Sequence, residues 1–120
     1  MMHFSETHEW LRLEGSIGTV GITQYAQKEL GEIVFIELPK VGQKVKAGQE
    51  ISVLESTKAA ADAYAPVSGT IIAVNELLRS APSTINQDPE IRGWLFKIEL
   101  SHPHELEHLL TSAQYKTITQ

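Results

Sequence analysis

Short runs of hydrophobic residues separated by turn residues dominate the chain and are typical of β-strands. The clearest run covers residues 94–100, whose large apolar side chains share one face of a predicted strand: Trp94, Phe96, Ile98 and Leu100. Further predicted strands cover residues 9–13, 16–22, 33–38, 51–54 and 69–74. The first two of these flank Glu14-Gly15, a pair suited to a hairpin turn because glycine accepts a positive φ. The pattern therefore predicts a mainly β chain.

Short helices are expected on either side of these strands. Residues 23–30 combine an N-capping Thr23 with a glycine at position 31, where a helix can end. After the last strand, Pro103 can open a second helix, whose inward stripe would be Leu106, Leu109 and Leu110.

The alanine-rich segment 55–63 does not fit the strand pattern. Its intrinsic propensity predicts a short helix capped by Ser56, since alanine is the best helix former and no Gly, Asn or Pro marks a turn. A helix of this length is marginal in isolation, so tertiary contacts must decide its structure.

The composition narrows the classes of function. The chain has 120 residues, 42% hydrophobic and 21% charged, which fits one globular domain. Its net charge of −5 argues against nucleic acid as the main partner and favours basic partner surfaces. Cysteine is absent, which excludes disulfides, a thiol nucleophile and thiolate metal ligands. Any sulfur chemistry must therefore come from a cofactor.

Signals for membranes, metals and catalysis are weak. No stretch of 18 apolar residues occurs, and residues 1–6 lack the features of a signal peptide, so we expect a cytoplasmic protein without a membrane partner. His104 and His108 have the i, i+4 spacing of a metal pair, but the segment offers no evident third ligand, and we predict no metal site. No nucleophile–base pair or phosphate loop is evident, so the sequence predicts a non-catalytic protein.

An ordered set of motifs over residues 4–116 resembles the biotinyl/lipoyl attachment domain family. The pattern is Gly42-x-x-Val45-x-x-Gly48-x-x-Ile51-x-x-x-Glu55-x-x-Lys58, followed by Ala65-Pro66-x-x-Gly69. Within it, the segment Glu55-Ser56-Thr57-Lys58-Ala59 is similar to the lipoyl-lysine site of glycine cleavage system H proteins, and Thr7-His8-Glu9-Trp10 matches the same family.

The resemblance implies a fold. It is a barrel-sandwich hybrid, a flattened β-barrel of two antiparallel sheets with short flanking helices, forming one domain over residues 1–120. The lipoyl-like core would cover about residues 16–100, and a C-terminal helical segment would cover about residues 102–116.

The resemblance also implies roles for individual residues. Lys58 would carry lipoate covalently at the tip of an exposed hairpin, which overrides the helical propensity of residues 55–63. The enzyme that attaches the lipoyl group, a lipoate ligase or a lipoyl/octanoyl transferase, would recognise Glu55, Ser56 and Ala59. Thr7, Glu9 and Asp62 match positions where a loaded arm folds into a surface cleft, and we expect both carboxylates to lie near the surface.

The function implied by the resemblance is that of a carrier. Such a protein takes an aminomethyl group from a pyridoxal-phosphate-dependent glycine decarboxylase to a tetrahydrofolate-dependent aminomethyltransferase. It then presents its dithiol to dihydrolipoyl dehydrogenase. It is a substrate of all three enzymes and catalyses none of the steps.

Three alternatives are open at this point. A biotin carrier usually has Met on both sides of its lysine, whereas Thr57 and Ala59 stand here. Lipoyl domains of 2-oxo acid dehydrogenases usually lack the Thr-His-Glu-Trp segment and the C-terminal helix. A stand-alone lipoyl relay or storage protein is the third, because residues 79–92 depart from the family pattern: a tyrosine and a glycine are missing before Gly93-Trp94, and Arg92 is gained.

Overall fold

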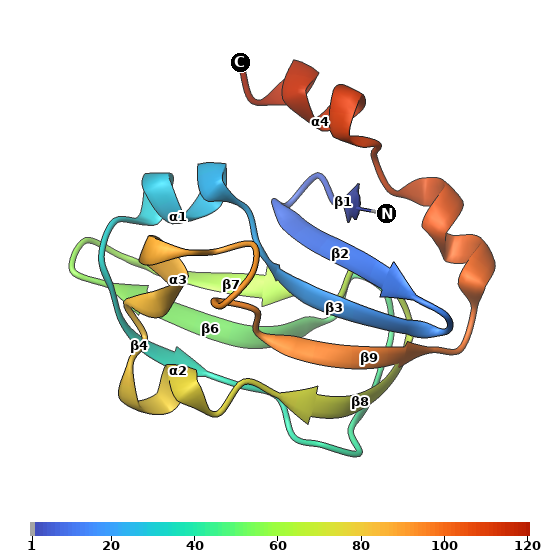
Figure 1. The fold of residues 1–120 in the computed structure, drawn as a ribbon, viewed down its shortest axis with the longest axis horizontal. Helices are drawn as coiled ribbons and strands as arrows, with labels where there is room; N and C mark the ends of the chain where they lie inside the picture. Colours follow the sequence, from blue (N-terminus) through green and yellow to red (C-terminus); the bar gives the residue numbers. More distant parts are fainter. Residues whose placement is uncertain (1) are drawn as a thin grey trace.

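The computed structural model describes residues 2–120, and its strands form two antiparallel sheets (Figure 1). The larger sheet has the order β1-β2-β3-β9-β8-β5, and the smaller has the order β4-β6-β7. The strands are β1 (Met2–Phe4), β2 (Glu9–Glu14), β3 (Ile17–Ile22), β4 (Ile33–Glu37), β5 (Lys44–Val45), β6 (Glu50–Ser56), β7 (Ala60–Tyr64), β8 (Gly69–Val74) and β9 (Phe96–Leu100).

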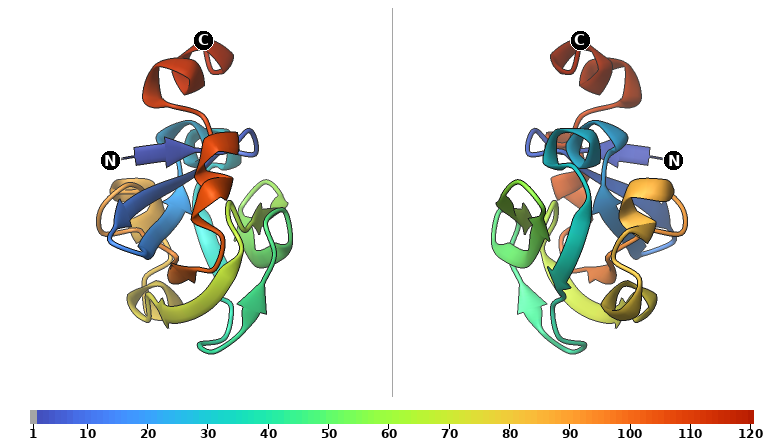
Figure 2. Two further views of the ribbon diagram at one scale, coloured as in Figure 1. Left: turned by 90° about the vertical axis from the view of Figure 1, so that its right-hand side faces the viewer. Right: turned by 90° about the vertical axis from the view of Figure 1, so that its left-hand side faces the viewer.

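The helices are short and lie around the two sheets (Figures 1 and 2). They are α1 (Gln24–Leu30), α2 (Leu77–Ser80), α3 (Thr84–Gln87), the 3₁₀ helix η1 (Pro103–His108) and α4 (Ser112–Ile118). Thr23 caps α1 by accepting a hydrogen bond from the Ala26 N–H, as predicted. Within residues 2–120, no helix has the length and apolar character needed to cross a bilayer.

The two antiparallel sheets and short flanking helices confirm the mainly β prediction, including its two-sheet layout. The strands of residues 2–120 form two separate sheets rather than one closed barrel. Met1, the first residue of the predicted domain, lies outside the described residues.

The main core lies between the two sheets. Alternation along β2 turns Leu11 into this core, where it joins Phe96 and Ile98 of the large sheet and Ile33 and Leu54 of the small one. All five side chains are almost fully buried, and burial of apolar surface is the dominant stabilising term for such a fold.

A second, aromatic cluster covers the opposite face of the large sheet. Trp10 is fully buried there with Phe4 and Tyr115, the last of these from the C-terminal α4. The tight packing depends on Gly21, the cross-strand neighbour of Trp10, because a Cβ at Gly21 would come within 2.6 Å of the indole. Trp10 Nε1 donates to the carbonyl of Pro89 at 3.0 Å and so ties this cluster to the long loop before β9.

Two local predictions are corrected by the structure. Trp94 does not share the face of Phe96, because β9 starts only at Phe96; Trp94 packs against the aromatic cluster, with the Lys97 ammonium 5.4 Å from its ring. The helix expected from Pro103 is a 3₁₀ helix that ends at His108, since Leu110 is extended and exchanges two backbone hydrogen bonds with Phe4. The sequence pattern also missed β1, which is only three residues long.

Candidate functional site

Lys58 lies at the tip of the β6–β7 hairpin and is exposed. Glu55 pairs with Ala60 on either side of the turn. Ser56 closes the turn: its backbone N–H donates to the Ala59 carbonyl at 2.8 Å, and its hydroxyl oxygen accepts from the N–H groups of Lys58 and Ala59. The hairpin prediction is confirmed, and the helix expected from alanine propensity is wrong, because strand pairing supplies the hydrogen bonds that a short helix would otherwise make.

The tip of the hairpin is fixed to the connection between α1 and β4. The N–H of Thr57 donates to the Glu32 carbonyl at 3.1 Å, and the Lys58 side chain lies across Gly31. Asn86 holds the same connection from the other side. Its amide nitrogen donates to the carbonyls of Gly31 and of the Gln27 side chain, and its amide oxygen accepts from the Ile33 N–H. Lys58 therefore stands on a platform held in place by hydrogen bonds from two other segments of the chain.

Asn86 is a residue of this platform that the sequence pattern did not predict. It lies in the irregular 75–93 segment, 28 positions from Lys58 in the numbering. An asparagine in a loop is usually a turn residue, so no local signal marks it as a bridge between two other elements.

A cleft of about 330 Å³ lies beside this platform and contains all three predicted arm-docking residues, Thr7, Glu9 and Asp62. Ile22 and Leu54 give it an apolar, buried lining, whereas Asp62 is exposed. The remaining lining residues come from the turn before β2, from α1 and from β7: His8, Tyr25, Ala26, Glu29, Leu30 and Ala61.

Glu9 is buried, with only 1% of its surface exposed, so the expectation that it lies near the surface is wrong. The turn between Ser5 and Glu9 wraps around its carboxylate, which accepts hydrogen bonds from the hydroxyls of Ser5 and Thr7 and from the Tyr64 N–H. Burial raises the pKa of Glu9, and these three donors oppose that shift because they favour the charged form. Asp62, in contrast, is exposed as expected.

The C-terminal helix α4 supports the cleft through Tyr115. The Tyr115 hydroxyl lies 2.8 Å from His8 Nδ1 and 2.6 Å from the Thr23 hydroxyl. His8 lines the cleft and has a positive φ of 75°, a conformation uncommon for residues other than glycine. Burial lowers the pKa of His8. Sequence reasoning did not find this contact, because His8 and Tyr115 are 107 positions apart.

The predicted recognition residues lie close to the lysine. Glu55 is exposed on β6, and the Ser56 hydroxyl donates across the turn to the Ala59 carbonyl. Glu55 lies directly opposite Phe35 of β4 in the small sheet.

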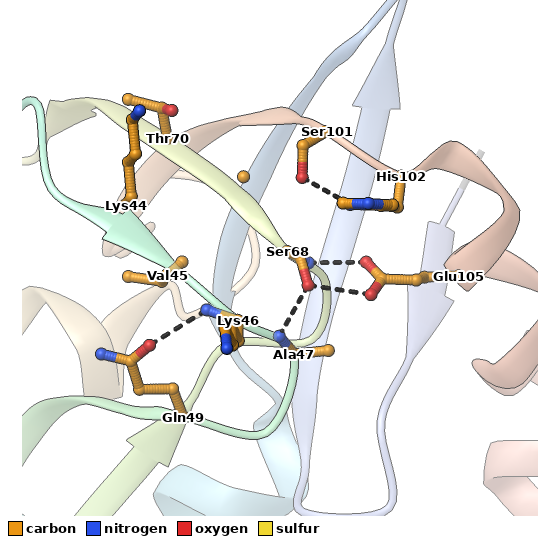
Figure 3. Close-up of a pocket in the computed structure, with 11 residues that line it drawn as sticks. Lys44, Val45, Lys46, Ala47, Gln49, Ser68, Thr70, Ser101, His102 and Glu105 are labelled. Carbon is orange, nitrogen blue, oxygen red and sulfur yellow. Dashed lines mark hydrogen bonds between the residues drawn. The ribbon is translucent and has the colours of Figure 1, made fainter.

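A larger hollow of about 740 Å³ lies elsewhere and includes none of the predicted site residues (Figure 3). There the Glu105 carboxylate accepts from the backbone N–H of Ser68 at 2.7 Å and from its hydroxyl at 2.8 Å, which fastens η1 to the loop before β8. His102 and His104 meet edge to face nearby. Among residues 2–120, no group of three or more His, Cys, Asp or Glu side chains is placed to hold a metal ion.

Comparisons with known proteins place the whole described chain in one family. The model of the glycine cleavage H-protein family matches residues 2–120. A glycine cleavage system H protein of Symbiobacterium thermophilum is 49% identical over 119 residues, which cover 99% of this chain and 93% of that protein. One of Thermotoga maritima is 51% identical over 116 residues, or 97% of this chain and 94% of that protein.

Solved structures give the same result. The crystal structure of a glycine cleavage system H protein from Mycobacterium marinum is similar to this chain with a TM-score of 0.89 and 36% identity. The match covers 98% of this chain and 94% of that one.

Proposed function

The chain belongs to the glycine cleavage H-protein family, and from this premise we propose that it carries a lipoyl group on Lys58 and serves a glycine cleavage system as its carrier protein. The observation that carries the proposal is the exposed Lys58 at a hairpin tip that is closed by Ser56 and hydrogen-bonded to the Glu32 carbonyl. A lysine that must enter several active sites in turn needs exposure together with a fixed base.

The residues around Lys58 fit such a group. The Lys58 side chain is exposed. The adjacent cleft combines an apolar lining with carboxylates, which suits a lipoyl arm whose hydrocarbon chain ends in a polar aminomethyl group. The lipoyl group would supply the two thiol sulfur atoms that a chain without cysteine lacks.

Attachment of the group requires one reaction of Lys58. The neutral amine attacks the carboxyl carbon of an activated acyl donor, such as an acyl adenylate. The new N–C bond forms as the bond to the leaving group breaks, and the nitrogen loses one proton. Glu55, Ser56 and Ala59 are the residues through which we expect the acylating enzyme to read the hairpin.

The cleft residues would protect the load. Asp62 is exposed at the cleft and can pair with a cationic amine, while the buried Glu9 presents a carboxylate fixed by three hydrogen bonds. Thr7 would act by positioning Glu9, because the Thr7 hydroxyl donates a hydrogen bond to the Glu9 carboxylate.

The chain itself would catalyse no step. It would accept the aminomethyl group from the pyridoxal-phosphate-dependent glycine decarboxylase, deliver it to the tetrahydrofolate-dependent aminomethyltransferase and present its dithiol to dihydrolipoyl dehydrogenase. The cytoplasmic location stays a prediction.

Mass spectrometry tests the attachment site. Coexpression with a lipoate ligase and lipoate should add one lipoyl mass to the wild-type chain, and peptide mapping should place it on Lys58. Lys58→Arg keeps the positive charge and should gain no mass. A lipoyl group on another lysine, or on the Lys58→Arg variant, would refute the assignment.

A further inference from the structure

Strand β4 exposes two large hydrophobic side chains next to each other, Val34 at 52% and Phe35 at 51%. Strict alternation would bury one of them, but the register shifts between Ile33 and Phe35 where β4 pairs with β6. As a result Ile33 and Ile36 are buried, and both residues between them face outward. An exposed pair of apolar side chains produced by a strand irregularity indicates an interaction surface.

The surface around this pair is acidic. The three strands of the small sheet contain four carboxylates and no lysine or arginine: Glu37, Glu50, Glu55 and Asp62. Glu55 is the cross-strand neighbour of Phe35, and Glu37 follows it by two positions on β4. Among residues 2–120, the single ion pair joins Arg79 of α2 to Glu76, the residue before this helix, so the four carboxylates of the small sheet have no cationic partner among the described residues.

The same surface adjoins the attachment lysine. Ile33, the first residue of β4, pairs with Ser56 at the hairpin turn, and the Lys58 side chain lies across Gly31, two positions before β4. A protein that holds the Lys58 amine in its active site must therefore also touch the start of β4.

We propose that Val34, Phe35, Glu37 and Glu55, called the β4 patch, form the docking surface for the enzyme that acylates Lys58. This inference rests on the proposed function. The enzyme presents an apolar pocket for Phe35, with a rim of lysine or arginine side chains that meets the carboxylates. Charge complementarity of this kind sets the encounter rate and orientation, while the buried aromatic side chain supplies most of the affinity.

The reach of the lysine explains why the acylating enzyme is the occupant. The bare side chain is a four-carbon stem, so the carrier surface beside it must enter the interface when the amine reacts. Once the longer lipoyl arm is attached, the reacting atoms lie farther from the carrier surface. The later partners can then serve the arm without covering β4.

Steady-state acylation by a lipoate ligase with ATP and lipoate tests the proposal. Phe35→Ser should lower kcat/KM for the carrier by about tenfold or more, mainly through KM, which is the size expected for an interface anchor. Glu37→Gln should weaken the dependence of kcat/KM on ionic strength. Val41→Ser is the matched control: Val41 is 62% exposed in the turn after β4, and its replacement should leave acylation unchanged.

The possible results separate the two proposals. Equal kcat/KM values for the wild type, Phe35→Ser and Glu37→Gln, with Lys58 fully acylated in each, would refute the β4 patch and leave the carrier role intact. Normal acylation of Phe35→Ser followed by poor turnover with glycine decarboxylase would also refute it, because the patch would then serve a different partner. Absence of acylation of the wild type would refute the proposed function and the patch with it.

Discussion

Lys58 lies directly over Gly31: a Cβ built on Gly31 would come within 2.9 Å of Lys58 Cε and 3.6 Å of Nζ. Gly31 also has φ 85° and ψ −163°, a backbone conformation that is essentially restricted to glycine. Gly31, which follows α1, thus leaves space for the Lys58 side chain and turns the chain toward β4.

Replacement of Gly31 by alanine should therefore affect stability and acylation together. The strained backbone should lower the free energy of unfolding by about 1–3 kcal/mol in urea titrations. The new methyl group should also displace the Lys58 side chain and slow its acylation. Gly15→Ala is the control, since Gly15 has φ 63° but no atom within 4 Å of its Cβ position: it should be destabilised and acylated at the wild-type rate. Wild-type stability of Gly31→Ala would contradict the account.

Titration of Glu9 should make stability depend on pH. Burial raises the pKa of Glu9 above its ordinary 4.5, so the folded state binds this proton more tightly than the unfolded state does. Its contribution is most favourable below 4.5 and is lost as the pH rises through the folded pKa. Glu9→Gln cannot titrate, and the free energy of unfolding of the wild type should fall relative to this variant as the pH rises above 4.5. Urea unfolding at several pH values measures the difference, and a difference independent of pH would contradict the prediction.

Loss of Asp62 should affect the loaded arm more than the fold. Asp62 is exposed, so Asp62→Ala should change the free energy of unfolding by no more than about 0.5 kcal/mol. A charge-assisted hydrogen bond contributes roughly 1.5–3 kcal/mol, which corresponds to about tenfold or more, and its loss should release formaldehyde and ammonia from the isolated loaded carrier faster by about that factor.

Glu50→Ala is the control for this release experiment, because Glu50 is an exposed carboxylate on the same sheet outside the cleft. Formaldehyde is followed over time after removal of the enzymes. Equal release from the wild type, Asp62→Ala and Glu50→Ala would show that Asp62 does not protect the load.

Tyr115 should stabilise the cleft through its hydroxyl. Tyr115→Phe retains the ring stacked on Phe4 at 4.7 Å but loses the contacts to His8 and Thr23. We expect the free energy of unfolding to fall by about 0.5–1.5 kcal/mol and the backbone amide of His8 to exchange faster with solvent. Thr117→Val, on the exposed side of α4, should change neither quantity. Unaltered exchange at His8 in Tyr115→Phe would exclude the supporting role.

The longer strands were predictable because their signals are local, whereas the lysine motif was found through its resemblance to a known family. Alternation located β9 within two residues, and Thr23 and Gly31 marked the ends of α1. The structure of residues 55–63 was not predictable from propensity, since the pairing of β6 with β4 and β7 overrides the alanine preference for helix. The burial of Glu9 escaped the pattern for a similar reason: its partners include Tyr64, which is 55 positions away. Contacts of Asn86 and Tyr115 depend on the same long-range packing.

Reconstitution of glycine oxidation tests the carrier role most directly. The lipoylated chain is combined with glycine decarboxylase, aminomethyltransferase, dihydrolipoyl dehydrogenase, glycine, tetrahydrofolate and NAD⁺, and NADH is followed by absorbance. The account predicts glycine-dependent NADH formation that saturates with the chain and is absent with Lys58→Arg. If the fully lipoylated chain produces no NADH where the Thermotoga maritima H protein does, the carrier role is contradicted and the stand-alone lipoyl relay is favoured.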